Sequence, residues 1–272
     1  MPSIHNLGAE FPNLAVDTQL GPMKVWDYQG DSWLIFFSHP KDYTPGASAE
    51  ELAGPATRFA RAACLPAPTA PPPSLYPPPS FSPPTPPPPS SHLSRPAVCT
   101  TELGKAASEE GEFKRRNVKL IALSCDSVED HKGWIADIVA ANGGAVTYPI
   151  ISDADRSTAV LLGMLDEEEK DAAGIPATVR KVFVVGPDHK IKLQLIYPTA
   201  VGRNFAEIFR VIDALQLAAR HPIATPVNWV PGGDVMIQPT VSDEKAAELF
   251  PGFSRTAVPS GKGYIRFTSA PK

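Results

Sequence analysis

The distribution of apolar and polar residues along the chain predicts an α/β domain that begins with strands. Residues 23–31 alternate between apolar and polar positions and end in a turn, which is typical of a half-buried strand. Residues 31–40 contain the run Trp-Leu-Ile-Phe-Phe, whose aromatic and branched side chains suit a buried central strand. The beginning of the chain therefore favours sheet structure.

After residue 98 the pattern changes to an alternation of helices and strands. In order, it predicts a helix over 99–117, a strand over 117–125, a helix over 128–142, a strand over 148–153, a helix over 155–165, two strands over 178–198 and a helix over 204–220. Beyond about residue 222 the chain is rich in loop residues, with one further helix over 242–250. This order is that of a thioredoxin-like α/β sandwich.

Capping and turn residues support these boundaries. Ser127, followed three positions later by Asp130, predicts a capped helix start, and Asn204 can cap the helix that follows it. The sequence Gly-Pro-Asp at 186–188 has the turn chemistry that joins two strands of a hairpin.

A proline-rich segment interrupts this pattern. The chain has 32 prolines, and 15 of them lie between Pro66 and Pro96, where charge and apolar periodicity are nearly absent. Proline lacks an amide donor and fixes φ, so the segment predicts polyproline II or disorder. Neither flank looks complete alone. Residues 46–97 are therefore interpreted as an insertion into one domain.

Charge and hydropathy exclude several classes of partner. Lys and Arg number 25 against 29 Asp and Glu, for a net charge of −4, which is not the basic footprint of a nucleic-acid-binding protein. No run approaches the ~18 apolar residues of a membrane-spanning helix, and the first residues do not resemble a signal peptide. The expectation is a soluble cytoplasmic protein without nucleic-acid or membrane partners.

Cysteine usage favours a reactive residue over a structural one. Cys64, Cys99 and Cys125 are too few and too irregularly spaced for a disulfide framework. No CxxC or Cys/His cluster suggests a metal, and no motif suggests a cofactor. Cys125 ends an apolar strand, where a buried structural role is preferred, whereas Cys64 lies in the insertion.

The residues on either side of the insertion form one motif when they are joined. Residues 38–45 (SHPKDYTP) followed by 98–103 (VCTTEL) give a proline, a threonine four positions later and a cysteine three after that. This joined motif resembles the peroxidatic motif of peroxiredoxins, and of the one-cysteine class in particular. The resemblance covers nearly all of residues 5–265 outside the insertion.

The resemblance implies a thioredoxin-like peroxidase domain over 1–197, interrupted by 46–97, and a smaller C-terminal domain over 198–272. It also implies reduction of hydrogen peroxide and organic hydroperoxides through a cysteine sulfenic acid, without a cofactor or metal. The partners that it implies are a peroxide substrate, a small-thiol or protein reductant, and a second copy of the chain in a homodimer.

Cys99 is the nucleophile that the motif predicts. A thiolate is a far better nucleophile than a thiol, and Cys99 opens a predicted helix whose free amides and dipole favour negative charge. By the resemblance, Arg156 places a guanidinium beside the sulfur and Arg180 supplies a second one. A lone arginine is also commonly a surface or ion-pair residue, so both assignments have an ordinary structural alternative.

Three further residues receive roles from the resemblance. Thr44 would hydrogen-bond the thiolate and the incoming peroxide, Pro40 would shield the sulfur from solvent, and His39 would line the substrate site. A histidine at the end of a strand is as often a polar terminus, and that alternative stays open for His39.

Some members of the family are also described as acidic phospholipases that use a serine, a histidine and an aspartate. Ser32 keeps the neighbourhood of the serine and Asp153 lies near the expected acid. The histidine position holds Trp26, and Leu34 replaces a glycine after Trp33. Ser32 would then lack an imidazole to accept its proton, so phospholipase activity is not expected.

The insertion leaves two functions open. It separates Thr44 and Pro45, which look like the cap and first residue of the catalytic helix, from Cys99. The first hypothesis is an active peroxidase. The second is a catalytically impaired peroxiredoxin scaffold whose PxxP stretches dock an SH3-like or WW-like partner.

Overall fold

The computed structural model describes residues 6–43, 98–170, 174 and 176–271. The predicted insertion at 46–97, the cap residue Thr44 and Cys64 lie outside the described residues. No described helix is long and apolar enough to cross a lipid bilayer.

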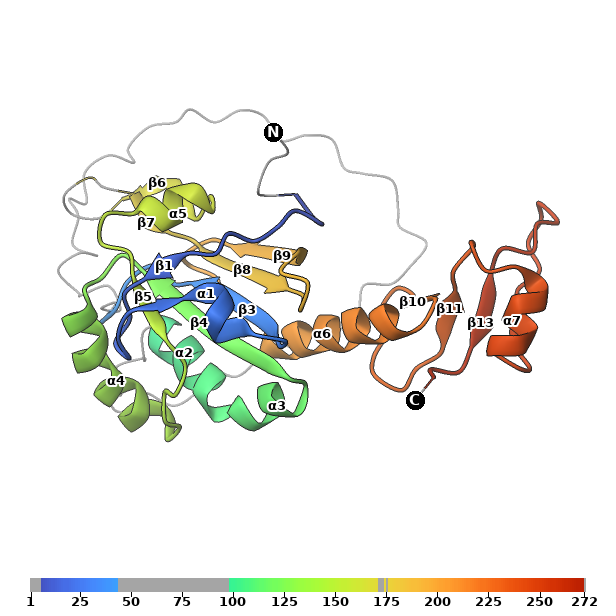
Figure 1. The fold of residues 1–272 in the computed structure, drawn as a ribbon, viewed down its shortest axis with the longest axis horizontal. Coiled ribbons are helices and arrows are strands. Elements are labelled where there is room, and N and C mark those ends of the chain that lie inside the picture. Colours follow the sequence, from blue (N-terminus) through green and yellow to red (C-terminus); the bar gives the residue numbers. More distant parts are fainter. Residues whose placement is uncertain (1–5, 44–97, 171–173, 175, 272) are drawn as a thin grey trace, which may run out of the picture. The chain divides into compact units, whose positions relative to one another are not determined.

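A five-stranded mixed sheet forms the centre of the fold, in the strand order β5-β4-β3-β8-β9 (Figure 1). The strands are β3 (Trp33–Ser38), β4 (Val118–Ser124), β5 (Ile150–Ser152), β8 (Arg180–Val185) and β9 (Ile191–Tyr197). β3, β4 and β5 run parallel, whereas β8 pairs antiparallel with both β3 and β9. This arrangement confirms the predicted thioredoxin-like fold class.

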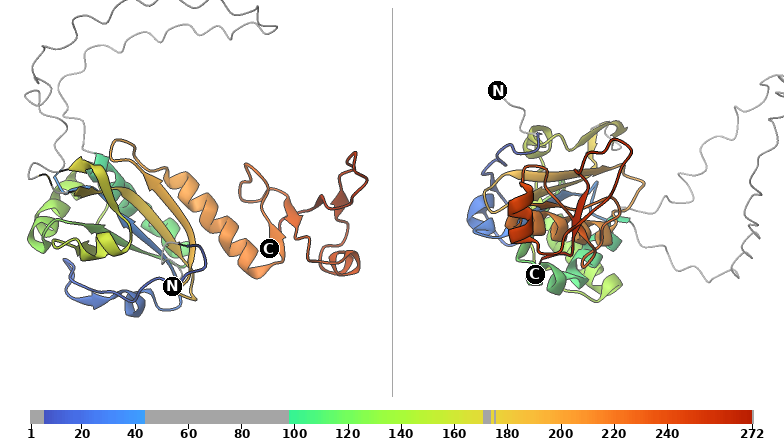
Figure 2. Two further views of the ribbon diagram at one scale, coloured as in Figure 1. Left: turned by 90° about the horizontal axis from the view of Figure 1, so that it is seen from above. Right: turned by 90° about the vertical axis from the view of Figure 1, so that its right-hand side faces the viewer.

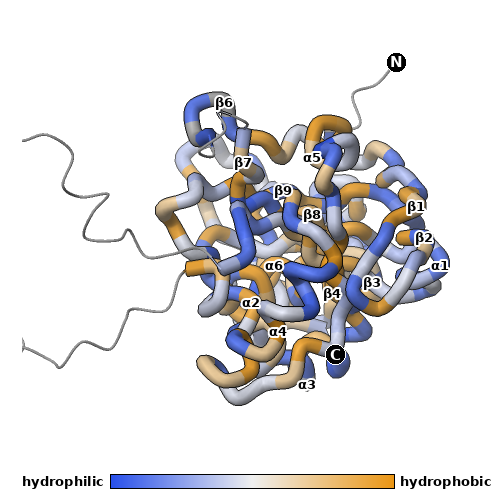
Figure 3. The backbone as a smooth tube through the Cα atoms, turned by 90° about the vertical axis from the view of Figure 1, so that its left-hand side faces the viewer, coloured by the Kyte–Doolittle hydropathy of each residue, from blue (hydrophilic) through white to orange (hydrophobic). Residues whose placement is uncertain are grey.

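Alternate side chains of the central strands enter two different apolar clusters, because successive residues of a strand point to opposite faces. Ile35 and Phe37 of β3 join one cluster, and Leu34 and Phe36 join the other. The first cluster includes residues of α2 (Val98–Ser108), α3 (Glu110–Arg115), α4 (Val128–Asn142) and α6 (Phe205–Arg220). The second includes residues of α1 (Val25–Gln29) and α5 (Ser157–Leu161). Hydrophobic segments at β4 and β8 are visible in Figure 3.

The predicted caps are confirmed. Ser127 accepts a hydrogen bond from the Asp130 amide, and the Asp130 carboxylate accepts one from the Ser127 amide, which completes a capping box at the start of α4. Gly143 ends that helix in the left-handed region, with φ of 72°. Asn204 accepts from the amides of Ala206 and Glu207 at the start of α6.

Two predicted elements differ from the structure. The strand expected over 23–31 is only β2 (Met23–Lys24), which pairs with β1 (Ala15–Val16) and is followed by α1. Val25 and Gln29 are buried whereas Asp27 between them is exposed, which fits a helical turn, since a strand would place all three residues on one face. The helix expected over 99–117 divides at Glu109 into α2 and α3.

The C-terminal segment contains a second sheet that the loop-rich sequence did not predict. Its order is β10-β11-β13-β12, with very short strands: β10 (Ile223–Ala224), β11 (Val235–Ile237), β12 (Ser254–Arg255) and β13 (Arg266–Thr268). The helix expected over 242–250 is α7 (Asp243–Leu249). A third apolar cluster joins this sheet and α7 to Ala214 and Leu217 of α6, whose earlier residues pack in the first cluster. Figure 2 shows α6 leading from the central sheet to the C-terminal strands.

A short hairpin of β6 (Leu165–Lys170) and β7 (Pro176–Thr178) precedes β8. The sequence analysis predicted no element over 166–177 and continued the preceding helix to Leu165, whereas α5 ends at Leu161. Thr178, at its end, donates a hydrogen bond to the carbonyl of His39, at 2.6 Å. The hairpin is thereby joined to the end of β3, where the candidate site begins.

Candidate active site

Cys99 lies in the first turn of α2 and is fully buried. Its Sγ accepts a hydrogen bond from Nη1 of Arg180, at 3.3 Å, although the two residues are 81 positions apart in the chain. Both the guanidinium and the dipole at the helix start favour a negative charge on sulfur. Two features that attract an anion therefore meet at one buried sulfur.

Two buried arginines share one carboxylate beside this sulfur. Arg180 Nη1 and Arg203 Nη2 each lie 2.7 Å from Oε2 of Glu102, which is one helical turn after Cys99. Arg203 also donates to Oε1 of Glu102 through its amide, at 2.7 Å, and through Nε, at 3.1 Å. The two cations and one carboxylate leave one net positive charge, which a thiolate would balance.

Backbone carbonyls fix the orientation of both guanidinium groups. Arg180 donates to the Thr199 carbonyl from Nε and Nη2, at 2.9 and 2.7 Å. Arg203 Nη1 donates to the Ser38 carbonyl, at 2.8 Å. Burial is the main cause that lowers the pKa of Arg203, while Glu102 opposes it. The network connects β3, α2, β8 and the segment before α6.

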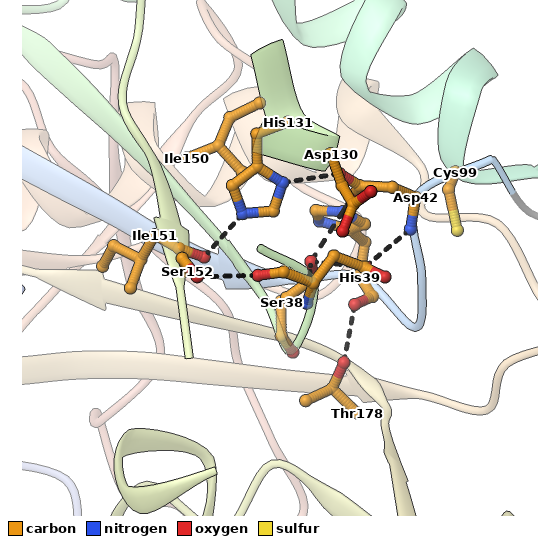
Figure 4. Close-up of polar contacts among 12 residues, drawn as sticks. Ser38, His39, Asp42, Cys99, Asp130, His131, Ile150, Ile151, Ser152 and Thr178 are labelled. Carbon is orange, nitrogen blue, oxygen red and sulfur yellow. Dashed lines mark hydrogen bonds and ion pairs between the residues drawn. The ribbon is translucent and has the colours of Figure 1, made fainter. Parts of the chain in front are cut away.

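A second polar cluster follows β3 directly (Figure 4). His39 Nε2 lies 2.7 Å from Asp42 Oδ1, and His131 Nδ1 lies 2.5 Å from Asp42 Oδ2. Both imidazoles are fully buried, and the His39 ring packs on Trp134 with centroids 5.2 Å apart. Burial alone would raise the pKa of Asp42, but the hydrogen bonds from His131 and His39 outweigh it and lower the pKa to about 2.

The comparisons with known proteins agree with this geometry. The model of the AhpC/TSA family matches residues 94–194, and that of the C-terminal domain of 1-Cys peroxiredoxin matches residues 214–252. Peroxiredoxin-6 of Rattus norvegicus is 45% identical over the full length of both chains, and that of Homo sapiens is 43% identical. The chain belongs to the peroxiredoxin family.

Solved peroxiredoxin structures extend the match. A cysteine-to-serine variant of peroxiredoxin 6 from Arenicola marina has a TM-score of 0.78 and 43% identity, covering 98% of this chain and 99% of that one. A yeast mitochondrial 1-Cys peroxiredoxin has a TM-score of 0.72 and 36% identity, covering 97% and 99%. The chain is a thiol peroxidase, and these matches do not favour the impaired, partner-docking scaffold.

The structure places the two predicted arginines of this peroxiredoxin differently. Arg180 contacts Cys99, as described above. Arg156 instead begins α5 with φ of 62°, donates to the carbonyls of Pro176 and Ala154, and lies near Cys125. Burial raises the pKa of the Cys125 thiol to about 11, against the opposing charge of Arg156.

Arg203 and Glu102 belong to the site although the sequence analysis assigned them no role. Glu102 lies in the matched motif, three positions after Cys99, and Arg203 directly precedes the helix cap Asn204. These positions in the sequence, next to the cysteine motif and next to a helix cap, were the signals that could have identified the two residues. Pro40 is half-buried directly after His39, and Thr44 lies outside the described residues.

Three carboxylate and imidazole groups approach one another closely enough to suggest a metal site. The candidate ligand atoms of His39, Asp42 and Asp126 lie within 4.8 Å of one another. Both oxygens of Asp42 already accept hydrogen bonds from imidazoles, and Asp126 Oδ2 accepts from the Ser124 hydroxyl and the Asp42 amide. The donors satisfy these acceptors without a cation, so the cluster is a hydrogen-bond network.

The residues of the discounted phospholipase site have other partners in this peroxiredoxin. Ser32 Oγ donates to Asn117 Oδ1, at 2.9 Å. Asp153 caps α5, since its carboxylate accepts from the amides of Thr158 and Ala159. Trp26, at the position where a histidine was expected, stacks on His189 with ring centroids 4.3 Å apart.

Proposed function

We propose that Cys99 is the peroxidatic nucleophile of this thiol peroxidase. Its thiolate attacks one oxygen of hydrogen peroxide or an organic hydroperoxide, so that an S–O bond forms and the O–O bond breaks. The leaving oxygen takes a proton and departs as water or an alcohol. The observation that supports this proposal is the hydrogen bond from Arg180 to the buried sulfur.

Arg180 takes the role of the principal activating guanidinium, with Arg203 and Glu102 holding it in place. One Arg180 nitrogen, Nη1, lies within reach of both Cys99 Sγ and Glu102 Oε2. A guanidinium fixed in advance at the position where negative charge stands needs little reorganisation during the reaction. Arg156, beside Cys125, has no assigned role in this chemistry.

Thr44, Pro40 and His39 complete the proposed site. Thr44 hydrogen-bonds the thiolate and the peroxide, Pro40 shields the sulfur, and His39 lines the substrate position. His39 is supported by its fully buried ring and by the Thr178 hydrogen bond that fixes its backbone.

The proposed reductant is a small thiol or a thioredoxin-type protein. This is supported by the yeast mitochondrial relative, whose thiol is resolved through glutathione and thioredoxin systems. A thiolate of the reductant attacks the sulfenic sulfur, and water leaves. We further propose a homodimer, a cytoplasmic location, and the division into a peroxidase domain over 1–197 and a C-terminal domain over 198–272.

Trapping of the sulfenic acid tests this function. The full chain is treated with one equivalent of hydrogen peroxide and a dimedone probe, and the labelled cysteine is located by peptide mass spectrometry. Label on Cys99, retained in Cys64→Ser and Cys125→Ser and lost in Cys99→Ser, is the expected result. Label that disappears in Cys125→Ser would overturn the assignment.

A further inference from the structure

The hydrogen bonds around His131 define its protonation state. Nδ1 faces Asp42 Oδ2 at 2.5 Å, and Nε2 faces the Ile151 carbonyl at 3.1 Å (Figure 4). A neutral imidazole has one N–H and one lone pair, so it can donate to only one of these oxygens. His131 therefore carries a proton on each nitrogen, unless Asp42 is itself protonated.

The surroundings of Asp42 favour its ionised form. Oδ1 accepts from His39 Nε2 and Oδ2 from His131 Nδ1. These donors favour the carboxylate over the acid. The lowered pKa of Asp42 agrees. The pair is therefore a buried imidazolium on a carboxylate.

The other carboxylates around the pair, Asp126 and Asp130, have hydrogen-bond donors of their own. They therefore do not need a positive charge on His39 as well. Asp126, after β4, has donors of its own in the Ser124 hydroxyl and the Asp42 amide, and burial followed by the charge of Asp42 raises its pKa. Asp130 of α4 is engaged in the capping box with Ser127. One positive charge, on His131, balances the charge of Asp42.

His39 is left with a bare nitrogen. Its Nε2 donates to Asp42, while its buried Nδ1 has no hydrogen-bond partner among the residues that the structure describes. The carbonyl of Ser38, the residue before His39, accepts a hydrogen bond from Arg203, which also pairs with Glu102 beside Cys99.

We propose that His131 is a positioning residue of the peroxidase site: as an imidazolium it neutralises Asp42, so that His39 stays uncharged with its proton on Nε2 and its Nδ1 bare. The inference deepens the proposed substrate role of His39 and rests on it. A bare Nδ1 can accept a hydrogen bond from the O–H of a peroxide, whereas a protonated Nδ1 cannot.

Nitrogen-15 NMR of the histidine rings tests the protonation states directly. The full chain is labelled at histidine, and spectra are recorded for the wild type and for Cys99→Ser, so that the result does not depend on peroxidase activity. The expected spectra show both nitrogens of His131 protonated and only Nε2 of His39 protonated. A bare nitrogen on His131, or a proton on Nδ1 of His39, would overturn the proposal.

The variant His131→Asn tests the coupling, because asparagine keeps a donor for Asp42 but has no charge. We expect His39 to gain a proton at Nδ1 and the rate constant of sulfenic-acid formation to fall by about tenfold. His189→Asn is the control, since His189 also hydrogen-bonds a buried side chain, Gln29, but packs with Trp26. If His39 keeps the same protonation state in folded His131→Asn, the coupling is refuted. If that variant does not fold, the wild-type spectrum still decides whether His131 is charged.

Discussion

Nη1 of Arg180 lies 3.3 Å from Sγ of Cys99 and 2.7 Å from Oε2 of Glu102. One guanidinium nitrogen thus connects the nucleophile to a buried carboxylate on the same helix. The same carboxylate is held by Arg203, which reaches the end of β3 through the Ser38 carbonyl. The position of the sulfur relative to the sheet is therefore fixed by charged hydrogen bonds as well as by apolar packing.

Replacing Arg180 by lysine tests the assignment of the activating cation. A lysine ammonium lacks the planar fork that bonds Cys99, Glu102 and Thr199 together. We expect Arg180→Lys to slow sulfenic-acid formation by at least about tenfold, equivalent to about 1.4 kcal/mol in the barrier. Stopped-flow fluorescence measures this rate. Arg156→Lys is the matched control, and a larger loss in that variant would show that Arg156 is the activating residue.

Glu102→Gln removes the carboxylate charge that pairs with both Arg180 and Arg203 in the part of the chain that the structure describes. Because both guanidinium groups are buried, the uncompensated charge should lower the free energy of unfolding by about 3–5 kcal/mol. Urea unfolding followed by circular dichroism measures it. Glu112 is far more exposed than Glu102 and pairs with Arg115 and Arg116, so Glu112→Gln should cost much less stability than Glu102→Gln. Equal losses in the two variants would contradict the argument.

Gly104 allows α4 to approach the catalytic helix closely. A Cβ at Gly104 would lie 2.0 Å from Cγ of Asn142, whose amide donates to the Thr100 carbonyl next to Cys99. Gly104→Ala should destabilise the fold by about 1–3 kcal/mol despite the higher helix propensity of alanine. Gly111 of α3 has open space around it, so Gly111→Ala should stabilise slightly. Thermal unfolding distinguishes the two.

The double variant Gly104→Ala/Asn142→Ala examines the same contact. Removing the Asn142 side chain makes room for the new methyl group, so the second substitution should cost less in the Gly104→Ala background than in the wild type. Strictly additive losses in unfolding free energy would show that the close approach is not what glycine provides.

Asp42 makes stability depend on acid pH. Its folded pKa, about 2, lies below the ordinary value of 3.8, so its contribution is fully present above pH ~4 and is lost as the pH falls towards 2. The contribution is on the order of 2 kcal/mol. Urea unfolding between pH 2 and 6, compared with Asp42→Asn, measures it. The variant should lose less stability over this range, and parallel curves would contradict the prediction.

Deleting residues 46–97 tests the effect of the insertion. The deletion joins Thr44 and Pro45 to Val98 and Cys99, which restores a cap and a first-turn proline to α2. Sulfenic-acid formation should then accelerate by at least about tenfold. A slower deletion protein would show that the inserted residues contribute to the site.

The order of the main elements from β3 to α6, apart from the β6–β7 hairpin, was determined by the sequence, because it depends on local patterns. The apolar run at β3, the capping box of Ser127 and Asp130, and the turn at 186–188 each encode a single element through its own residues. The motif around Cys99 was legible for the same reason, once the residues before and after the insertion were joined. The helical turn at Val25–Gln29 was missed because short alternation fits a strand equally well.

Which side chains meet was decided only by the tertiary structure. Arg180 reaches Cys99 because β8 pairs antiparallel with β3, with Val182 opposite Phe37, and no local pattern specifies that register. Arg156, equally plausible in the sequence, instead donates to the carbonyls of Pro176 and Ala154 and lies near Cys125. The bond of Asp42 to His131 likewise depends on the tertiary structure, because the two residues are 89 positions apart and a hydrogen bond forms only where the folded chain brings donor and acceptor together.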